Sequence, residues 1–387
     1  MMRINIRNLY YRTMLLFPIT TLFQLYFDNI NRILFGFLFA LQLLLLLKNK
    51  KIFNWVIILL MIAVFSYNLF ITHGALYNSN ELFYYPFAII FLIYSSFTID
   101  EVYDYFKNDK KYIKFIIVSW SILVFVSIFL GSSWTSGWGG GRYFGSFCQS
   151  IWRLAPTAVF ICCLSIAYMN ILNKKKYFYF LIIPMFCFLM GGSRTYLIVG
   201  ILIFLLGWYY FSKTKRIFLL SLIPILFVLI ILIGKSTMMD KFNAVTYSKN
   251  SYFDFWGTIT SGRSIFWEKD ILAFRNADLI NKLLGNGLNF IYEVNYNAIG
   301  DRIWAHNDFI QCLVSHGIVG LILYCTAIVK VIKNIFSKKY SAIPILLIIL
   351  IWGLNAFFNM FYTYFCSILS FIYLIVAIKC VPDKNKL

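Results

Sequence analysis

The chain has 387 residues, of which 61% are hydrophobic, 20% are aromatic and 13% are charged. Soluble domains carry about 25% charged residues, roughly twice this share. A soluble fold of this length would leave too much apolar surface in water. The composition therefore excludes a soluble enzyme, a disordered protein and a nucleic-acid-binding module, and it predicts an all-α, polytopic membrane protein.

The net charge of +20 comes from 35 Lys and Arg against 15 Asp and Glu. In a soluble protein such an excess would indicate nucleic-acid binding. Here the lysines gather at the ends of apolar runs, as the positive-inside rule describes for membrane proteins. The excess also suits an anionic membrane surface, so membrane lipid is an expected partner and nucleic acid is not.

Twelve apolar runs follow one another along the chain, and their continuous rather than alternating character favours helices over strands. They cover 10–27, 33–47, 55–72, 82–99, 115–131, 153–172, 177–191, 195–212, 217–234, 306–329, 342–358 and 360–379. We expect about twelve spans of about 20 residues each, with 177–191 the weakest candidate for a full span. The arginines before the first run resemble a signal-peptide n-region, but no small-residue cleavage site follows, so we expect a retained first span.

Lysine alternates between the connections of these runs: even-numbered connections hold lysine clusters, and odd-numbered ones are poor in lysine. By the positive-inside rule both termini lie in the cytoplasm. This leaves one long extracytoplasmic loop, 235–305, within a single domain, 1–387. Apolar residues at helical spacing over 264–284 predict amphipathic helices in the loop, which we expect to act as a lid over the site.

Arginines in glycine- and serine-rich contexts mark the extracytoplasmic side. Arg142 follows three glycines, Arg194 lies in Gly-Gly-Ser-Arg-Thr, and Arg263 lies in Thr-Ser-Gly-Arg-Ser. Arginine recognises phosphate bidentately, and glycine-rich turns add anion-binding N–H groups. A single arginine at a span end is more simply explained as reaching toward lipid headgroups. Three of them on the side that should be poor in arginine favour a pyrophosphate site.

His306, Asn307 and Asp308 stand where the tenth run begins. A histidine at the water boundary can act as a general base near neutral pH, although an interfacial polar residue without a special role explains the position equally well. A carboxylate such as Asp308 or Glu268 is the alternative base. Trp304 is a candidate platform for a sugar ring, with the interfacial aromatic belt as the alternative.

Glycines stand on both sides of this histidine. Gly285 and Gly287, in Gly-Asn-Gly, give a weak turn signal. The segment 317–320, Gly-Ile-Val-Gly, lies within a run and indicates a close helix contact. His316 is ten residues beyond His306, about 80° short of three full helical turns. We therefore expect His316 to point elsewhere and to be packed or hydrogen-bonded.

Several chemistries lack their motifs. The sequence has no H-E-x-x-H, no G-x-x-x-x-G-K-[ST] and no extracytoplasmic Asp-x-Asp pair for a metal ion. No run carries the dense set of carboxylates that a proton-driven pump needs. We expect a glycosyl transfer at this site to rely on arginine electrostatics, without a metal or a cofactor.

The motifs occur in a fixed order, with the first arginine in 142–145, Gly-Ser-Arg-Thr at 192–195, Ser-Gly-Arg at 261–263, Gly-Asn-Gly at 285–287 and His-Asn-Asp at 306–308. This order resembles the O-antigen ligase and Wzy-type polysaccharide polymerase superfamily, over roughly half of the chain. The resemblance implies a GT-C-like glycosyltransferase with many helical spans. It also implies an undecaprenyl-pyrophosphate-linked oligosaccharide as donor, at the extracytoplasmic face of a bacterial cytoplasmic membrane.

In that superfamily, arginines of the outer loops bind the donor pyrophosphate and the His-Asn motif lies at the active site. Carried over to this chain, these roles fall on Arg142, Arg194, Arg263 and His306. The first motif departs from the family pattern, because 146–150 lacks its Pro-Asn pair, which makes Arg153 at the start of the sixth run a substitute for the first arginine. The further candidates for substrate binding are Arg153, Asn307, Asp308, Glu268, Gly285, Gly287 and Trp304.

Three functions remain open at this stage. A polymerase would join lipid-linked repeat units into a surface polysaccharide, and a ligase would move the glycan to another acceptor. A lipid-linked glycan flippase would transport without chemistry, but it should show two related halves and polar residues near the bilayer midplane. The polar residues here gather on one face, which favours a transferase. A chain-length regulator and a flippase of the same pathway are partners implied by the resemblance alone.

Overall fold

The computed structural model describes residues 5–27, 29–48, 55–136, 142–212, 214–234, 236, 260, 262–336 and 342–379. Two short strands, β1 (Trp134–Ser136) and β2 (Arg142–Phe144), pair antiparallel. The helices are α1 (Ile6–Leu22), α2 (Ile30–Lys48), α3 (Trp55–Ile71), α4 (Glu81–Asn108), α5 (Lys110–Ile128), α6 (Ile151–Leu172), α7 (Ile182–Met190), α8 (Arg194–Phe211), α9 (Lys215–Gly234), α12 (Arg263–Asn276), α13 (Leu279–Leu284), α14 (Phe290–Ile299), α15 (Asp308–Phe336), α16 (Ala342–Phe358) and α17 (Phe365–Lys379).

Each of the twelve apolar runs contains one of these helices, namely α1–α9 and α15–α17. In the described part of the chain, seven helices are long and apolar enough to cross a membrane, and α3, α16 and α17 are shorter apolar helices. The expectation of an all-α, multi-pass membrane protein is therefore confirmed.

The run at 177–191 forms a short element instead of a full span. It folds as a 3-10 segment, Lys175–Leu181, followed by α7, which has only 9 residues. A helix of that length extends about 14 Å, less than half of a hydrocarbon core of about 30 Å. Pro184 in the first turn of α7 fits this position, since its missing N–H has no intrahelical partner there.

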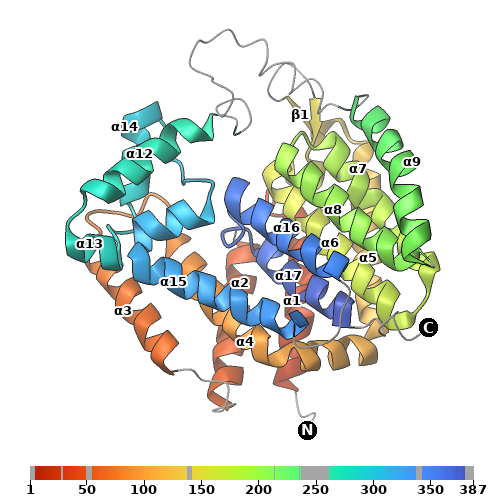
Figure 1. The fold of residues 1–387 in the computed structure, drawn as a ribbon, viewed down its shortest axis with the longest axis horizontal. Coiled ribbons are helices and arrows are strands. Elements are labelled where there is room, and N and C mark those ends of the chain that lie inside the picture. Colours follow the sequence, from red (N-terminus) through yellow and green to blue (C-terminus); the bar gives the residue numbers. More distant parts are fainter. Residues whose placement is uncertain are drawn as a thin grey trace.

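The centre of the bundle is formed by α4, α6 and α17, with α1, α5, α8 and α16 packed around them (Figure 1). Almost all of α6 and α17 is buried. Small side chains such as Ala158, Cys162 and Ala167 are fully buried on α6, which lets neighbouring helices approach closely. The centre thus holds the surrounding helices in fixed positions.

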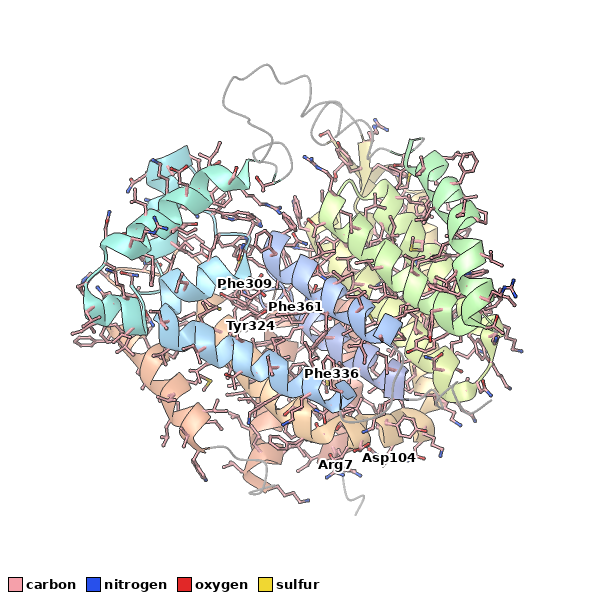
Figure 2. All side chains as sticks on the ribbon, viewed as in Figure 1. Arg7, Asp104, Phe309, Tyr324, Phe336 and Phe361 are labelled. Atoms are coloured by element: carbon pink, nitrogen blue, oxygen red, sulfur yellow. The ribbon has the colours of Figure 1, made fainter. Side chains whose placement is uncertain are left out.

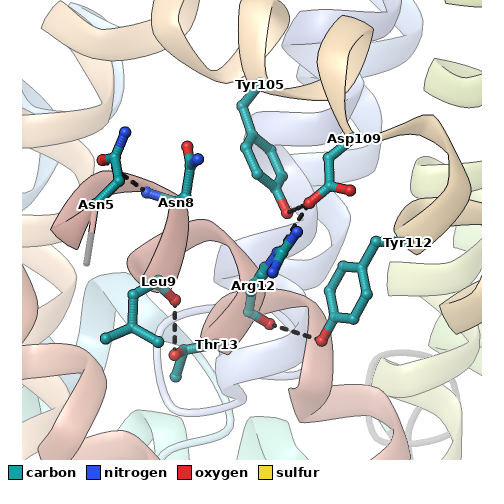
Figure 3. A network of polar contacts seen from close by, with 8 residues as sticks. All are labelled: Asn5, Asn8, Leu9, Arg12, Thr13, Tyr105, Asp109 and Tyr112. Carbon is teal, nitrogen blue, oxygen red and sulfur yellow. Dashed lines mark hydrogen bonds and ion pairs between the residues drawn. The ribbon is translucent and has the colours of Figure 1, made fainter. Parts of the chain in front are cut away.

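One end of the bundle is joined by polar contacts between α1, α4 and α17. Arg12 Nε donates to Asp109 Oδ2 at 2.9 Å, and the Tyr105 hydroxyl donates to the same oxygen at 3.0 Å (Figure 3). Lys379 pairs with Asp100 at the end of α17. The start of α1 and the end of α17 therefore lie at the same end of the bundle.

The outer helices α12, α13 and α14 form a group at one side of the molecule, next to α3 and the first part of α15 (Figure 1). Side chains at the end of α3 and just beyond it hold the loop before α14: Asn68 Oδ1 accepts from Gly287 N at 2.8 Å, and Thr72 Oγ1 accepts from Leu288 N at 2.8 Å. The buried Tyr292 hydroxyl donates to Glu81 at 2.7 Å. The described part of the long loop is therefore built into the fold.

Gly285 and Gly317 lie where the end of α13 crosses a kink in α15. Both have positive φ values, +110° and +68°, and a Cβ on either would lie within 2.6 Å of backbone atoms across the contact. Gly317 is the non-helical residue inside α15. The close contact expected for this glycine is confirmed, and Gly285 serves the same contact. Gly287, by contrast, contacts the end of α3 and Thr72 just beyond it.

His316 is fully buried and stacks on Tyr85, with ring centroids 3.9 Å apart. Neither of its ring nitrogens has a hydrogen-bond partner among the described residues. The Tyr85 hydroxyl donates to the Gly320 carbonyl at 2.8 Å. His316 is therefore packed, as expected, through its ring face and not through hydrogen bonds.

Candidate active site

Arg194 is the first residue of α8 and follows a turn with little space. Gly192 has φ +68°, and a Cβ there would lie 2.2 Å from Cδ1 of Tyr143 in β2. Only glycine fits under this ring, so the Gly-Gly-Ser-Arg sequence sets the point at which α8 begins. The guanidinium of Arg194 is partly buried, beside a helix N-terminus that already carries partial positive charge.

Arg263 occupies the same position in α12. It is the first helical residue, Gly262 before it has φ +82°, and its Nη1 donates to the Phe358 carbonyl at the end of α16. Burial and, to a smaller extent, the charge of Arg194 lower the pKa of Arg263 to about 10. No salt bridge joins Arg263 to a carboxylate of the described residues. The two arginines therefore place two like charges near each other at two helix N-termini.

His306 lies two residues before α15, in the left-handed region with φ +52°. Its ring packs edge-on against Trp304, with centroids 6.0 Å apart, and its buried Nδ1 has no hydrogen-bond partner among the described residues. Burial lowers the pKa of His306 to about 3, and the charge of Arg263 acts in the same direction. The imidazole is therefore neutral at physiological pH and can accept a proton.

Asn307 has a structural role that explains its position. It is buried, and its Oδ1 accepts from Phe309 N at 3.0 Å and Ile310 N at 3.1 Å, as an N-cap of α15. Because of this cap, the first turn of α15 begins next to His306. Three helices, α8, α12 and α15, thus begin around the same site, and their N-termini favour an anion there.

Asp308 is fully buried and accepts a hydrogen bond from the Tyr324 hydroxyl. The Tyr324 ring packs edge-on against Phe309, with centroids 6.4 Å apart (Figure 2), and the backbone of Tyr362 and Phe361 lies near this carboxylate. Glu268 is exposed on α12. Neither carboxylate has a described contact with His306, so His306 is the better placed base.

Arg142 and Arg153 lie at the rim of this arrangement. Arg142 is exposed at the start of β2, whose next residue, Tyr143, covers Gly192. Arg153 is partly buried in the first turn of α6, near Cys148. The described contacts place neither arginine beside Arg263. The glycines before Arg142, 139–141, lie outside the described residues, as do 237–259 of the long loop and Ser261.

The α16–α17 turn supplies a part of the site that the sequence did not indicate. Its Tyr364 is close enough to Arg263 for that charge to lower the pKa of Tyr364, although burial raises the pKa overall to about 12. The Tyr364 ring contacts Trp304 at 6.3 Å and Tyr196 of α8 at 6.4 Å between centroids. Aromatic side chains from three elements therefore meet beside Arg263, and no motif in the sequence marks Tyr196 or Tyr364.

The arrangement combines an anion-binding pair with a neutral base. Two guanidinium groups can hold a diphosphate bidentately, and they would stabilise negative charge that develops on its oxygens as a bond to it breaks. His306 could take a proton from an attacking hydroxyl. Among the described residues, no group of three or more His, Cys, Asp or Glu is arranged to hold a metal ion.

The profile of the O-antigen ligase family (Wzy_C) matches residues 178–325. The matched part contains Arg194, Arg263 and His306, and it excludes Arg142 and the α16–α17 turn. The match supports the O-antigen ligase/polymerase superfamily and a glycan-processing role with lipid-linked substrates, without separating ligase from polymerase. A comparison with curated proteins found no match.

Proposed function

We propose that this protein polymerises undecaprenyl-pyrophosphate-linked oligosaccharide repeat units into a surface polysaccharide. The reaction would take place on the extracytoplasmic face of a bacterial cytoplasmic membrane, with both chain termini in the cytoplasm. The observation that carries the proposal is the pair Arg194 and Arg263, each the first residue of a helix, beside the neutral His306. An anionic ligand would relieve the repulsion between the two guanidinium groups.

The proposed step is a displacement at the anomeric carbon of the donor sugar. The acceptor hydroxyl forms a new glycosidic bond to this carbon, and the bond between the carbon and the diphosphate oxygen breaks. The electron pair leaves with the polyprenyl pyrophosphate, whose growing charge Arg194 and Arg263 stabilise. His306 takes the hydroxyl proton, and the step needs no metal and no cofactor.

Donor binding would also prepare the base. The pKa of His306 is low because the site is buried and because Arg263 is positively charged. A diphosphate bound to Arg263 brings negative charge to the same place, which raises the pKa of the imidazole toward its ordinary value. The histidine would thus become a stronger base only when the donor is present.

The test is a transfer assay with purified protein in proteoliposomes that contain a lipid-linked repeat unit. A polymerase yields a ladder of two or more repeats on the polyprenyl carrier. Arg194→Ala and Arg263→Ala should lose at least about a hundredfold in rate, the cost of a lost transition-state contact. Arg275→Ala removes an exposed arginine in the last turn of α12 and serves as the matched control. A full ladder from both alanine variants would contradict the assignment.

A ligase is the second candidate function, because the family description that matches 178–325 is O-antigen ligase. The same assay distinguishes the two. A ligase produces no ladder from the repeat unit alone, and it transfers the glycan only after a second acceptor, such as a lipid A core, is added. The arginine and histidine roles are the same in both reactions.

A further inference from the structure

An apolar cavity of about 320 Å³ lies between α7, α8 and α9, away from the arginines themselves. Its size lies within the range of small-molecule pockets. It is partly open, and its lining side chains Val228 and Leu232 on α9 are 52% and 44% exposed, so the opening lies at the surface of α9. All of its lining side chains are apolar, and they include Met185, Leu189, Phe204, Pro224, Val228 and Leu232.

The cavity results from the shortness of α7. Because α7 has only 9 residues, it covers a part of the length along which α8 and α9 run. The other face of α9 is open, with Ile223 at 77% and Ile230 at 67% exposure. In a membrane protein such a face lies against lipid, so the cavity opens laterally into the bilayer.

The lining residues extend from the ends of α7 and α9 that lie nearest Arg194 to just past the midpoints of α8 and α9. Leu189 is one residue before the end of α7, and Leu232 is two residues before the end of α9. Phe204 is ten residues from Arg194, the start of α8, and Pro224 is ten residues from Gly234, the end of α9. Ten residues span about 15 Å of helix. The cavity therefore runs from the arginine end of the bundle through about one leaflet of a hydrocarbon core.

We propose that this cavity, the α7–α9 groove, holds the polyisoprenoid chain of the donor lipid, with its diphosphate at Arg194. This assignment rests on the proposed function. A groove without a polar side chain accepts only hydrocarbon, and a pair of arginines at its end selects a hydrocarbon chain that carries a strong anion. A lipid-linked pyrophosphate has both parts in this order. The groove would then fix the donor's anomeric carbon relative to His306 by holding its tail.

The test uses a tryptophan that fills the groove. Val228→Trp places a large side chain at the lining, whereas Ile230→Trp places the same side chain on the lipid-facing side of α9 and is the control. Leu232→Trp repeats the test nearer the arginine end. The probe is undecaprenyl pyrophosphate with a diazirine on its tail, photolysed in proteoliposomes and mapped by mass spectrometry.

We expect the probe to cross-link to α8 and α9 in the wild type, and added undecaprenyl phosphate should reduce this labelling by competition. Val228→Trp should weaken the labelling about tenfold, the effect of roughly two methylene groups left unburied, and Ile230→Trp should not. In the transfer assay, Val228→Trp should raise KM for a long-tailed donor and leave KM for a donor of two isoprene units unchanged.

Three results would overturn the groove assignment. The first is labelling that maps elsewhere. The second is equal labelling of the groove by a diazirine phosphatidylcholine that the polyprenyl lipid does not displace, which would make a bilayer acyl chain the occupant. The third is a groove closed to both probes, which would show that no lipid occupies it. Photolabelling needs no turnover, so the two proposals can fail separately. Sugar transfer without a labelled groove would leave the proposed function intact. A labelled groove without transfer would contradict only the proposed function.

Discussion

Arg263 shows how single residues at this site are positioned by their neighbours. Its guanidinium is anchored through the Phe358 carbonyl, its helix begins directly after Gly262, and its pKa is lowered by burial and by Arg194. With a pKa of about 10 it still carries its charge at neutral pH. A positive charge held in this way is a strong attractor for a diphosphate.

Replacing Arg263 with lysine tests whether the planar guanidinium is needed. Arg263→Lys keeps the charge but loses the fork that binds a diphosphate through two parallel hydrogen bonds. We expect a rise in KM for the lipid-linked donor of about tenfold or more, since one good hydrogen bond to a charged group is worth about 1.5–3 kcal/mol. Arg275→Lys on the same helix should leave KM unchanged. Equal KM values for wild type and Arg263→Lys would show that Arg263 does not bind the donor.

The pH dependence of the reaction should reveal the base. The pKa of His306 is about 3 in the free protein, so protonation of this residue should not lower kcat/KM until well below pH 6. Bound diphosphate offsets the charge of Arg263, so the acidic limb of kcat should lie at higher pH than that of kcat/KM. Two limbs at the same pH would contradict the coupling, and His306→Gln should remove the limb together with most of the rate.

Asp270 on α12 makes a separate prediction about stability. It is fully buried, neither carboxylate oxygen has a partner among the described residues, and burial raises its pKa to about 8. The folded protein therefore holds a proton that the unfolded chain releases, so stability falls as pH rises from about 4 to about 8.

Asp270→Asn should accordingly raise the Tm in detergent by a few degrees at pH 9. The gain should shrink as pH falls and vanish near pH 4, where the carboxyl is neutral in both states. Differential scanning fluorimetry across this pH range provides the measurement. The same gain at every pH would show that the carboxyl does not titrate in this way, and Asp278→Asn, at the exposed cap of α13, is the comparison.

At the scale of elements, the site depends on how the outer helices dock. The end of α13 crosses the kink of α15 at Gly285 and Gly317, and Asn68 of α3 holds the loop that follows. These contacts fix α12–α14 relative to α15, and so they fix Arg263 relative to His306. The predicted lid is in its described part, 262–305, a docked element that contributes Arg263 itself.

Gly317→Ala should disrupt this docking. An added Cβ would meet the Leu283 carbonyl oxygen at 2.4 Å, at a φ of +68° that side chains disfavour. We expect a loss of more than about 1 kcal/mol in stability, seen as a lower Tm and reduced transfer. Gly353→Ala in α16 is the control, because nothing lies within 4 Å of its added Cβ. A Gly317→Ala protein as stable as this control would rule out a tight crossing.

Several elements could be predicted from the sequence because their causes are local. Continuous apolar runs gave the helices, and glycine before arginine marked where α8 and α12 begin. The sequence marks 177–191 as the weakest candidate for a full span, and the structure agrees, but hydropathy alone could not predict a helix as short as the 9-residue α7 there. Its length depends on the turn under Tyr143 and on the 3-10 segment before it.

Other parts of the site arise only from tertiary packing. Tyr364 and the Phe358 carbonyl belong to a turn about 100 residues from Arg263 in sequence, and no motif marks them. Asn307 and Gly285 were predicted as substrate-binding residues, and their described contacts are a helix cap and a backbone crossing. Sequence position alone could not separate these structural contacts from ligand contacts.

Across the whole molecule, charged groups lie at both ends of the central helix α17. Lys379 pairs with Asp100 at one end of α17, and Tyr364, which precedes α17, lies near Arg263 at the other. A helix of 15 residues separates them, about 22 Å. The arginine end of the bundle therefore faces one membrane surface, and the α7–α9 groove descends from it into the adjacent leaflet.

The active-site assignment is tested in cells by separating the surface polysaccharide of a deletion strain on a gel, after complementation at matched membrane expression. Wild type and Arg275→Ala should restore the ladder of repeat lengths, whereas Arg194→Ala, Arg263→Ala and His306→Ala should leave single repeat units. Full-length polymer retained on its lipid carrier in the deletion strain would assign a ligase instead. A normal ladder from all three site variants would contradict the central claim that these residues form the active site.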